Sequence, residues 1–241
     1  MKIASYANPD LPKWRMAPGV TRPTLFYRVM RQGCRVFMPG VWKIRVFNRH
    51  YEPATGGVVY ISNHQSFLDP MLVGFGLQRP LSYMARDTLF KRAGFRELIT
   101  AVNAFPVKRG TADVGALKEA MRRIKGGGGV LLFAEGTRTL DGHIGPLLPG
   151  MAMLAQRAAQ WTVPVVIDGA YECWPRTQKF PSTGSIVVQY GPAIPQDEAR
   201  KHAPEEFVKI VRSKMIEIQT DMRRRVGRPE LKYEEEHHDA I

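Results

Sequence analysis

The sequence predicts an α/β domain in which helices flank a mixed, largely parallel sheet. Short runs of β-branched and aromatic residues alternate with helical patterns from residue 43 to residue 190, and such alternation is typical of strands joined by helical crossovers. A chain of 241 residues is long enough for one sizeable core. A hydrophobic content of 44% and a charged content of 24% are those of an ordinary folded protein. We therefore expect one domain, preceded by an N-terminal amphipathic helical segment.

The first 42 residues differ in composition from the rest. Residues 1–23 hold four prolines and little periodicity, which predicts a loose arm. Residues 24–42 mix large apolar side chains with three arginines and contain no acid, which is the composition of a helix lying in a membrane interface. The same pattern fits an amphipathic helix packed on the core, and both arrangements can hold for different faces. Gly33 and Pro39 are expected to break a long helix.

The remaining elements follow from periodicity and turn residues. Residues 43–47 alternate as a strand, and we expect them to pair, through the connection at 48–57, with the strand at 58–61. Further strands are predicted at 81–85, 104–107, 130–133, 161–167 and 185–190. Helices are predicted from 70 to about 77 and at 88–102, 113–125, 151–160 and 206–225. The four glycines at 126–129 indicate a helix end, since no Gly-Lys-Ser/Thr follows them as in a nucleotide-binding loop.

A polar turn directly follows the strand at 58–61. It carries His64 and, five residues later, Asp69. Pro70 suits the first turn of a helix, and Asp69 suits its N-cap. A turn allows the Asp69 carboxylate to reach one imidazole nitrogen and leaves the other nitrogen to take a proton from a substrate hydroxyl. The alternative is a histidine and a helix-capping aspartate that meet for structural reasons only.

Two groups of polar residues lie at the ends of later strands. Lys108 and Arg109 follow the strand at 104–107, where two cations beside glycine can hold a phosphate or form a solvated basic corner. The strand at 130–133 ends before a second group, which consists of Glu135, Gly136, Thr137 and Arg138. An arginine in this position can bind a phosphate through two parallel hydrogen bonds, with Glu135 orienting it.

These motifs, in this order, resemble those of the glycerolipid acyltransferase family, which includes the lysophosphatidate (1-acylglycerol-3-phosphate) acyltransferases. The similar blocks lie at residues 63–70, 84–91, 105–110, 133–138 and 163–166. Any one block would be a weak signal, but several in the family's order make a specific match. Ala134 stands where the family usually has proline, and Ile167 follows Val166 where a second proline is usual.

The resemblance implies a single acyltransferase-type α/β domain at residues 43–228. From their composition, we expect residues 1–42 to form an N-terminal arm and amphipathic helices at a membrane interface. The acidic residues near the C-terminus predict a disordered tail at residues 229–241. The implied reaction transfers a fatty acyl group from a thioester, acyl-CoA or acyl carrier protein, to the free hydroxyl of lysophosphatidate. The product would be phosphatidate, in phospholipid biosynthesis, with no cofactor beyond the acyl co-substrate.

The resemblance also assigns roles to the residues above. His64 would be the catalytic base, and Asp69 would orient it. The residues implied in binding the substrate phosphate are Lys108, Arg109, Glu135, Gly136, Thr137 and Arg138. The two cysteines of the chain match no metal-ligand spacing, so we expect no metal site.

The net charge of +13 implies an anionic partner: a phospholipid surface, a nucleic acid or a phosphorylated substrate. No secretory signal is visible, and no run approaches the roughly 18 uncharged apolar residues of a spanning helix. We therefore expect peripheral attachment to an anionic phospholipid membrane surface on its cytoplasmic side. No helix-turn-helix, finger or aromatic sheet signature supports binding to nucleic acid.

Two classes of alternative remain open from the sequence. The acceptor could be glycerol 3-phosphate, a lysophospholipid or another lipid alcohol. The protein could also be a non-catalytic basic protein that binds membranes or nucleic acid. Turnover of a thioester by the purified protein separates the first class from the second.

Overall fold

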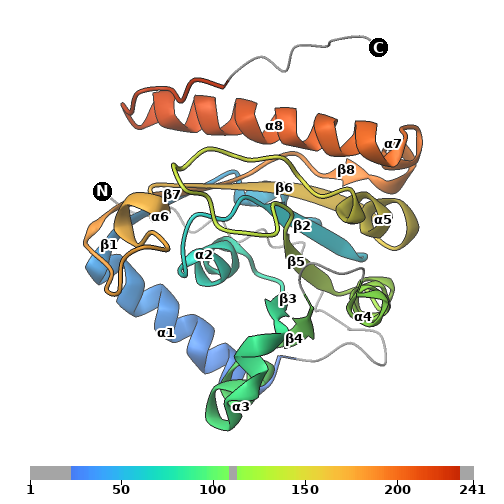
Figure 1. The fold of residues 1–241 in the computed structure, drawn as a ribbon, viewed down its shortest axis with the longest axis horizontal. Coiled ribbons are helices and arrows are strands. Elements are labelled where there is room, and N and C mark those ends of the chain that lie inside the picture. The colour runs from blue at the N-terminus through green and yellow to red at the C-terminus, as the bar shows by residue number, and fades with distance from the viewer. Residues whose placement is uncertain (1–22, 109–112, 234–241) are drawn as a thin grey trace.

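The computed structural model describes residues 23–108 and 113–233 (Figure 1). The strands of its sheet are β1 (Trp42–Phe47), β2 (Val58–Ser62), β3 (Leu81–Arg86), β4 (Ala104–Val107), β5 (Gly129–Phe133), β6 (Trp161–Asp168), β7 (Gly184–Tyr190) and β8 (Ile194–Pro195). The α-helices are α1 (Leu25–Val41), α2 (Asp69–Gly76), α3 (Ala93–Ala101), α4 (Val114–Lys125), α5 (Gly150–Arg157), α6 (Ala170–Cys173), α7 (Gln196–Arg200) and α8 (Pro204–Arg225). Two short 3-10 helices, η1 (Arg49–Tyr51) and η2 (Asp87–Lys91), lie in connections.

The sheet runs in the order β1-β7-β6-β2-β5-β3-β4, and β8 pairs with β6. β6 is antiparallel to β7 and to β8, and the other pairs are parallel. The predicted α/β class with a mixed, largely parallel sheet is therefore confirmed. Central β2 is buried along its whole length, as expected for a parallel strand covered on both faces.

The predicted pairing of residues 43–47 with the strand at 58–61 is wrong. β1 pairs in parallel with β7, and both β7 and β6 lie between β1 and β2. The burial of the two strands gives the physical reason. β2 is fully buried and takes a central place between β5 and β6, whereas β1 is half exposed and suits the sheet edge.

Two hydrophobic cores lie on opposite faces of the sheet. Because successive side chains of a strand point to opposite faces, Val59 and Ile61 enter one core, and Val58 and Tyr60 enter the other. α8 and α5 cover the first core, and α2 covers the second (Figure 1). Among the described helices, none is both long and apolar enough to cross a bilayer.

α1 is one continuous helix that contains both Gly33 and Pro39, so the predicted break does not occur. Its Thr24 cap accepts a hydrogen bond from the N–H of Tyr27, and Tyr27 and Met38 are buried against the domain. The guanidinium groups of Arg31 and Arg35 on the same helix donate to main-chain carbonyls in the last turn of α2 and just beyond it, at residues 75–79. These tertiary contacts outweigh the low helix propensity of glycine and proline.

The predicted helix at 88–102 consists of two pieces, η2 and α3, which are separated at Arg92. None of the residues of α3 is buried, so packing against the sheet does not stabilise a single long helix over this segment. At the other end of the chain, Tyr233 packs on the domain: its hydroxyl accepts a hydrogen bond from Ile144 N and donates one to Gln219. Residues 234–241 and the arm at 1–22 lie outside the described residues.

Candidate active site

The turn after β2 brings His64 and Asp69 together. The Nδ1 atom of His64 lies 2.7 Å from Oδ2 of Asp69. The same oxygen accepts the main-chain N–H groups of Gln65, at 2.6 Å, and of Ser66, at 2.7 Å. Because a carboxylate accepts hydrogen bonds, this contact favours a proton on Nδ1 and leaves Nε2 as the acceptor of the ring.

Asp69 does not cap α2 as predicted. The helix begins at Asp69, and its N-cap residue is Leu68. The carboxylate turns back toward the preceding turn, where three donors meet it, and it is completely buried. Asp69 therefore orients the imidazole and shapes the turn at the same time.

The His64 ring is fixed from two further directions. It stacks on Phe133, with ring centroids 4.1 Å apart and planes 16° from parallel. The neighbouring Asn63 side chain binds β6, donating to Ile167 O at 2.9 Å and accepting from Ile167 N at 2.8 Å. Only 8% of His64 is exposed, so the imidazole is held with little freedom at the edge of a cavity.

Glu135 lies behind the turn that carries His64. Its carboxylate accepts the main-chain N–H of His64 at 2.8 Å and that of Gly145 at 3.1 Å. It thus joins the turn that carries His64 to the loop that follows β5. Burial raises the pKa of the Glu135 carboxyl to about 7, although the two N–H donors act in the opposite direction.

This raised pKa gives a prediction for stability. A carboxyl with a higher pKa in the folded state stabilises the protein below its unfolded pKa, near 4.5, and this contribution is lost as the pH rises through about 7. Relative to a Glu135→Gln variant, the wild type should therefore lose stability between pH 4.5 and 7.5. Between the two pKa values, the free energy of unfolding falls by about 1.4 kcal/mol per pH unit. Urea denaturation at several pH values measures this loss.

Glu119→Gln provides the control for this experiment. A hydrogen bond from Arg122 lowers the pKa of the Glu119 carboxyl to about 2. The difference between wild type and Glu119→Gln should stay constant above pH 5.5, because this group is ionised in both states there. If the difference in unfolding free energy between wild type and Glu135→Gln did not change with pH over the same range, the raised pKa of Glu135 would be contradicted.

The other predicted phosphate-binding residues lie in different surroundings. The guanidinium of Arg138 stacks on the Phe67 ring, 3.6 Å from its centroid, and lines the same cavity as His64. Gly136 has a φ of 71° and closes a turn with its N–H on Phe133 O, so its role here is in the backbone. Thr137 is exposed.

Lys108 is exposed at the end of β4 and does not line this cavity. Its main-chain N–H donates to Asp113 at 2.9 Å. Arg109 lies outside the described residues. Of the predicted site residues that are described, the structure therefore places His64, Asp69 and Arg138 around one site, with Glu135 behind it.

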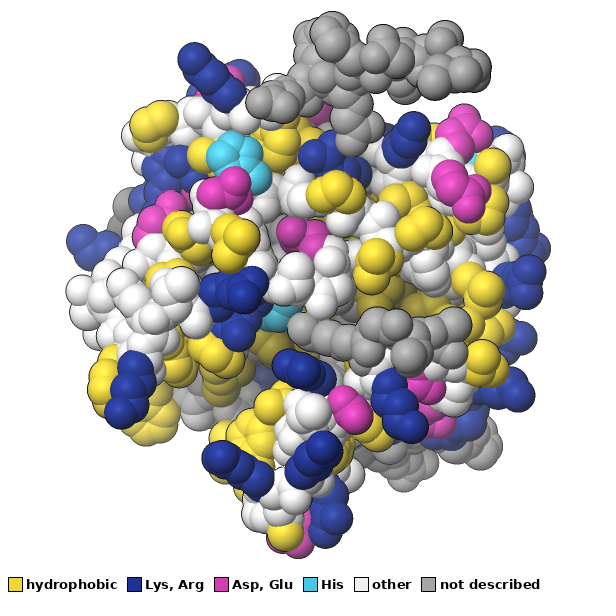
Figure 2. Space-filling view, viewed as in Figure 1, with side chains coloured by type: hydrophobic (Ala, Val, Ile, Leu, Met, Phe, Trp, Pro, Cys, Tyr) yellow, Lys and Arg dark blue, Asp and Glu magenta, His cyan; other side chains and the backbone are white. Residues whose placement is uncertain are grey.

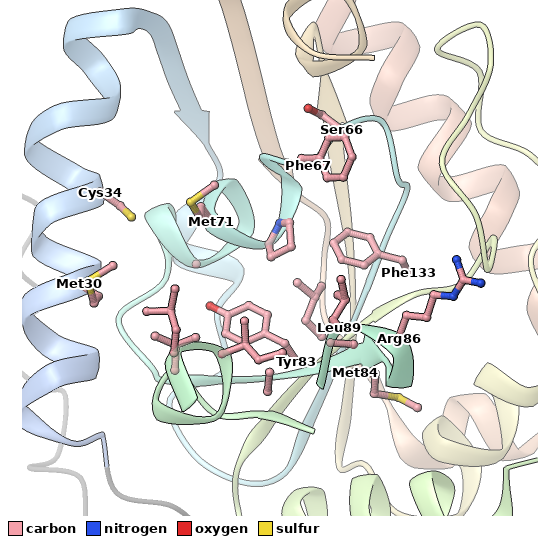
Figure 3. Close-up of a pocket in the computed structure, with 18 of the residues that line it drawn as sticks. Met30, Cys34, Ser66, Phe67, Met71, Tyr83, Met84, Arg86, Leu89 and Phe133 are labelled. Carbon is pink, nitrogen blue, oxygen red and sulfur yellow. The ribbon is translucent and has the colours of Figure 1, made fainter. Parts of the chain in front are cut away.

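The cavity beside His64 has a volume of about 670 Å³ (Figure 3). It is lined by residues of α1, α2, β3, η2, α3, β4 and β5 and of the turn after β2, and most of the side chains that line it are apolar or aromatic. Arg31, Arg86 and Arg138 are the cations on its wall. In the space-filling view, hydrophobic side chains surround the hollow, with lysines and arginines near its rim (Figure 2). An apolar space with a few cations suits a ligand with a hydrocarbon chain and an anionic group.

The residues described here include no group of histidine, cysteine, aspartate or glutamate side chains that fits a metal ion. At the edge of the cavity, His64 and Asp69 form a hydrogen-bonded pair, an arrangement that is able to act as a base with an orienting carboxylate.

Sequence reasoning assigned no role to the buried Gln65, which is central to the site. Its Nε2 donates to Gly142 O at 3.0 Å, and its Oε1 accepts from the N–H groups of Ala170 and Tyr171, each at 3.2 Å. Gln219 on α8 also donates to Gly142 O, at 3.2 Å. The sequence gives little indication of this role, because a single glutamine in a polar turn does not show which distant residues it contacts.

Comparisons with known proteins agree with this architecture. A 1-acyl-sn-glycerol-3-phosphate acyltransferase from Bacillus subtilis is 28% identical over 144 residues, which cover 59% of this chain and 71% of that protein. The chloroplastic 1-acyl-sn-glycerol-3-phosphate acyltransferase BAT2 of Brassica napus is 31% identical over 119 residues, or 48% of this chain. The matched segment spans about a third of the length of the Brassica protein, 34%.

The fold also has a counterpart among solved structures. The 1-acyl-sn-glycerophosphate (LPA) acyltransferase PlsC from Thermotoga maritima superposes with a TM-score of 0.67 at 22% identity, over 80% of this chain and 79% of that one. This likeness shows a shared fold. The model of the family described as Acyltransferase matches residues 43–168, more than half of the 241 residues. The chain therefore belongs to the Acyltransferase family.

Proposed function

We propose that the protein transfers a fatty acyl group from a thioester donor, acyl-CoA or acyl carrier protein, to the free hydroxyl of lysophosphatidate, forming phosphatidate. The observation that carries this proposal is the His64–Asp69 pair at the edge of an apolar cavity that also holds Arg138. The names of the relatives from Bacillus and Brassica support the choice of acceptor.

The geometry suits direct transfer between the two substrates. Nε2 of His64 takes the proton of the acceptor hydroxyl while the oxygen of that hydroxyl attacks the carbonyl carbon of the thioester. The new C–O bond forms, the C–S bond breaks, and the proton passes to the departing thiolate to give a free thiol. The thioester is already activated, so an acyl-enzyme is not required. Ser66 lines the cavity, but its hydroxyl donates to Trp174 O at 2.9 Å.

Asp69 supports this step electrostatically. Its buried carboxylate keeps Nδ1 protonated and stabilises the positive charge that the ring acquires when Nε2 takes a proton. Phe133 and Asp69 fix the ring plane, so no reorientation is needed as the proton moves.

Arg138 is proposed to bind the phosphate of the acceptor. Stacking on Phe67 orders its guanidinium next to the cavity, and a planar fork matches phosphate geometry. Lys108, Arg109, Gly136 and Thr137 belong to the same proposal through the family resemblance.

Replacing Arg138 by alanine should raise the KM for lysophosphatidate by roughly tenfold to a hundredfold, as expected for one charge-assisted contact. The kcat should change much less. Arg138→Lys should recover only part of the loss, because an ammonium group cannot form the two parallel hydrogen bonds. Initial rates at varied acceptor and saturating donor measure both constants. An unchanged KM with a reduced kcat would remove Arg138 from the phosphate site.

The protein is further proposed to act at the cytoplasmic surface of an anionic phospholipid membrane. α1 packs on the domain with one face and exposes apolar side chains on another. These exposed residues recur at helical spacing: Leu25, Phe26, Val29, Met30, Val36, Phe37 and Val41. An exposed apolar stripe on a helix that carries arginines and no acid is typical of a membrane-interface helix.

The decisive experiment measures thiol release by the purified protein with lysophosphatidate as acceptor. Acyl-CoA and acyl carrier protein are tested as donors, and glycerol 3-phosphate, a lysophosphatidylcholine and a long-chain alcohol as other acceptors. The expected result is donor turnover that depends on lysophosphatidate and yields phosphatidate. Preference for another acceptor would replace the proposed substrate, and absence of turnover with every pair would refute the proposed activity.

A further inference from the structure

The loop between α6 and β7, residues 174–183, presents an apolar side chain to the outside. Phe180 in this loop is 72% exposed. The loop is ordered by its own hydrogen bonds: Ser182 N donates to Cys173 O at 2.8 Å, and Trp174 Nε1 donates to Gln178 O at 3.2 Å. The phenyl ring of Phe180 therefore projects into solvent from an ordered loop, and it adds little to the hydrophobic core of the domain.

This loop lies beside the C-terminal end of α1 (Figure 1). Trp42, the residue after α1, donates its indole N–H to Ser182 O at 2.9 Å. Trp42 also pairs with Gly184 at the start of β7. Phe180 is four residues before Gly184, at most about 14 Å along the chain. The exposed end of α1, where Phe37 is 76% exposed, and the loop therefore form neighbouring parts of one surface.

Both parts of this surface carry cations and no acid. Within residues 174–183 the charged side chains are Arg176 and Lys179, and both are exposed. Residues 23–51 contain one lysine and five arginines but no aspartate or glutamate. Apolar groups that project among cations are complementary to an anionic bilayer, whose headgroups attract the charges and whose acyl boundary takes the apolar groups. A second copy of the chain would bring like charges together on this face.

We propose that the 174–183 loop is a second membrane contact, which inserts Phe180 into an anionic phospholipid bilayer next to α1. This inference rests on the proposed membrane association and names a further surface for it. The loop also reaches the active site: Trp174 O accepts from Ser66 Oγ at 2.9 Å, and the Trp174 ring lies 5.2 Å from that of Phe67. Contact at Phe180 would therefore hold the cavity at a fixed orientation toward the bilayer.

Binding to vesicles tests this proposal directly. Full-length protein is titrated with vesicles of phosphatidylcholine containing phosphatidylglycerol, and the bound fraction is measured by sedimentation. Phe180→Ser should weaken binding roughly tenfold or more, as expected for withdrawing a phenyl group from an apolar environment. Phe180→Trp should bind like the wild type, because indole suits the interface.

Val114→Ser is the matched control. Val114 is 56% exposed at the start of α4, which packs on β3, β4 and β5, away from the β1–β7 edge of the sheet. This variant should bind vesicles like the wild type. Wild-type binding by Phe180→Ser would overturn the proposal. So would a lower melting temperature without a loss of binding, which would assign Phe180 to a contact within the chain.

The charge part of the proposal has its own test. Arg176→Ala together with Lys179→Ala should weaken binding to the anionic vesicles roughly fivefold per cation and have little effect with phosphatidylcholine alone. Equal effects on both vesicle types would contradict electrostatic attraction. A His64→Ala variant should bind vesicles like the wild type, so the membrane contact can be judged even if the proposed transfer reaction fails.

Discussion

Replacing His64 by alanine is expected to abolish acyl transfer, with a fall in kcat of about 100- to 10,000-fold, the range for a placed general base. The fold should persist, because Asp69 Oδ2 keeps its hydrogen bonds from the N–H groups of Gln65 and Ser66 after the imidazole is removed. Single-turnover thiol release with saturating lysophosphatidate measures the chemical step, since product release no longer limits the rate.

Thermal unfolding and binding to anionic vesicles are the controls for His64→Ala. Both should match the wild type within experimental error. Near-normal turnover by a folded His64→Ala protein would show that another group, or the solvent, takes the proton. Loss of folding would leave the role of the imidazole to be judged from His64→Gln, which fills a similar volume and cannot act as a base.

Replacing Asp69 by asparagine is expected to cause the second largest loss, again about 100- to 10,000-fold in kcat. The amide oxygen can still accept hydrogen bonds from the turn, but it carries no charge to stabilise a protonated His64 ring. If the amide group is turned around, its NH₂ faces the donors at Gln65 and Ser66, which opens the turn. The KM for the acceptor should change little, because Asp69 is completely buried.

The double variant His64→Ala/Asp69→Asn separates orientation from other effects. If Asp69 acts through His64, the double variant should be no slower than His64→Ala alone, because the two residues form one unit. A further large fall in the double variant, with the fold intact, would give Asp69 a role of its own. Full activity in Asp69→Asn would show that the contact of 2.7 Å between His64 Nδ1 and Asp69 Oδ2 stabilises the turn without contributing to catalysis.

The local features of this chain were predictable because their geometry depends on near neighbours. Apolar residues spaced by three and four predicted the helix that became α4. The turn after β2 was predictable for the same reason, since His64 and Asp69 are five residues apart and their contact needs no distant element. The break predicted at Pro39 failed because tertiary contacts hold α1 together.

Contacts between distant parts of the chain were not predictable in the same way. Glu135 reaches the N–H of His64 across 71 residues, and nothing in the order of its neighbours distinguishes this from a phosphate contact. The partner of β1 was also missed, because alternation marks a strand and says nothing about which strand lies next to it.

The sequence alone therefore determined the α/β class, the positive charge and the histidine with its aspartate, because composition, periodicity and a short turn encode them locally. Only the tertiary structure decided the surroundings of that histidine. Residues from several separate elements line the cavity. The Glu135 carboxylate accepts the main-chain N–H of His64, and the 174–183 loop contacts the end of α1 through two residues that are 140 positions apart in the sequence. Such contacts depend on how whole elements pack together, and packing is a property of the complete chain.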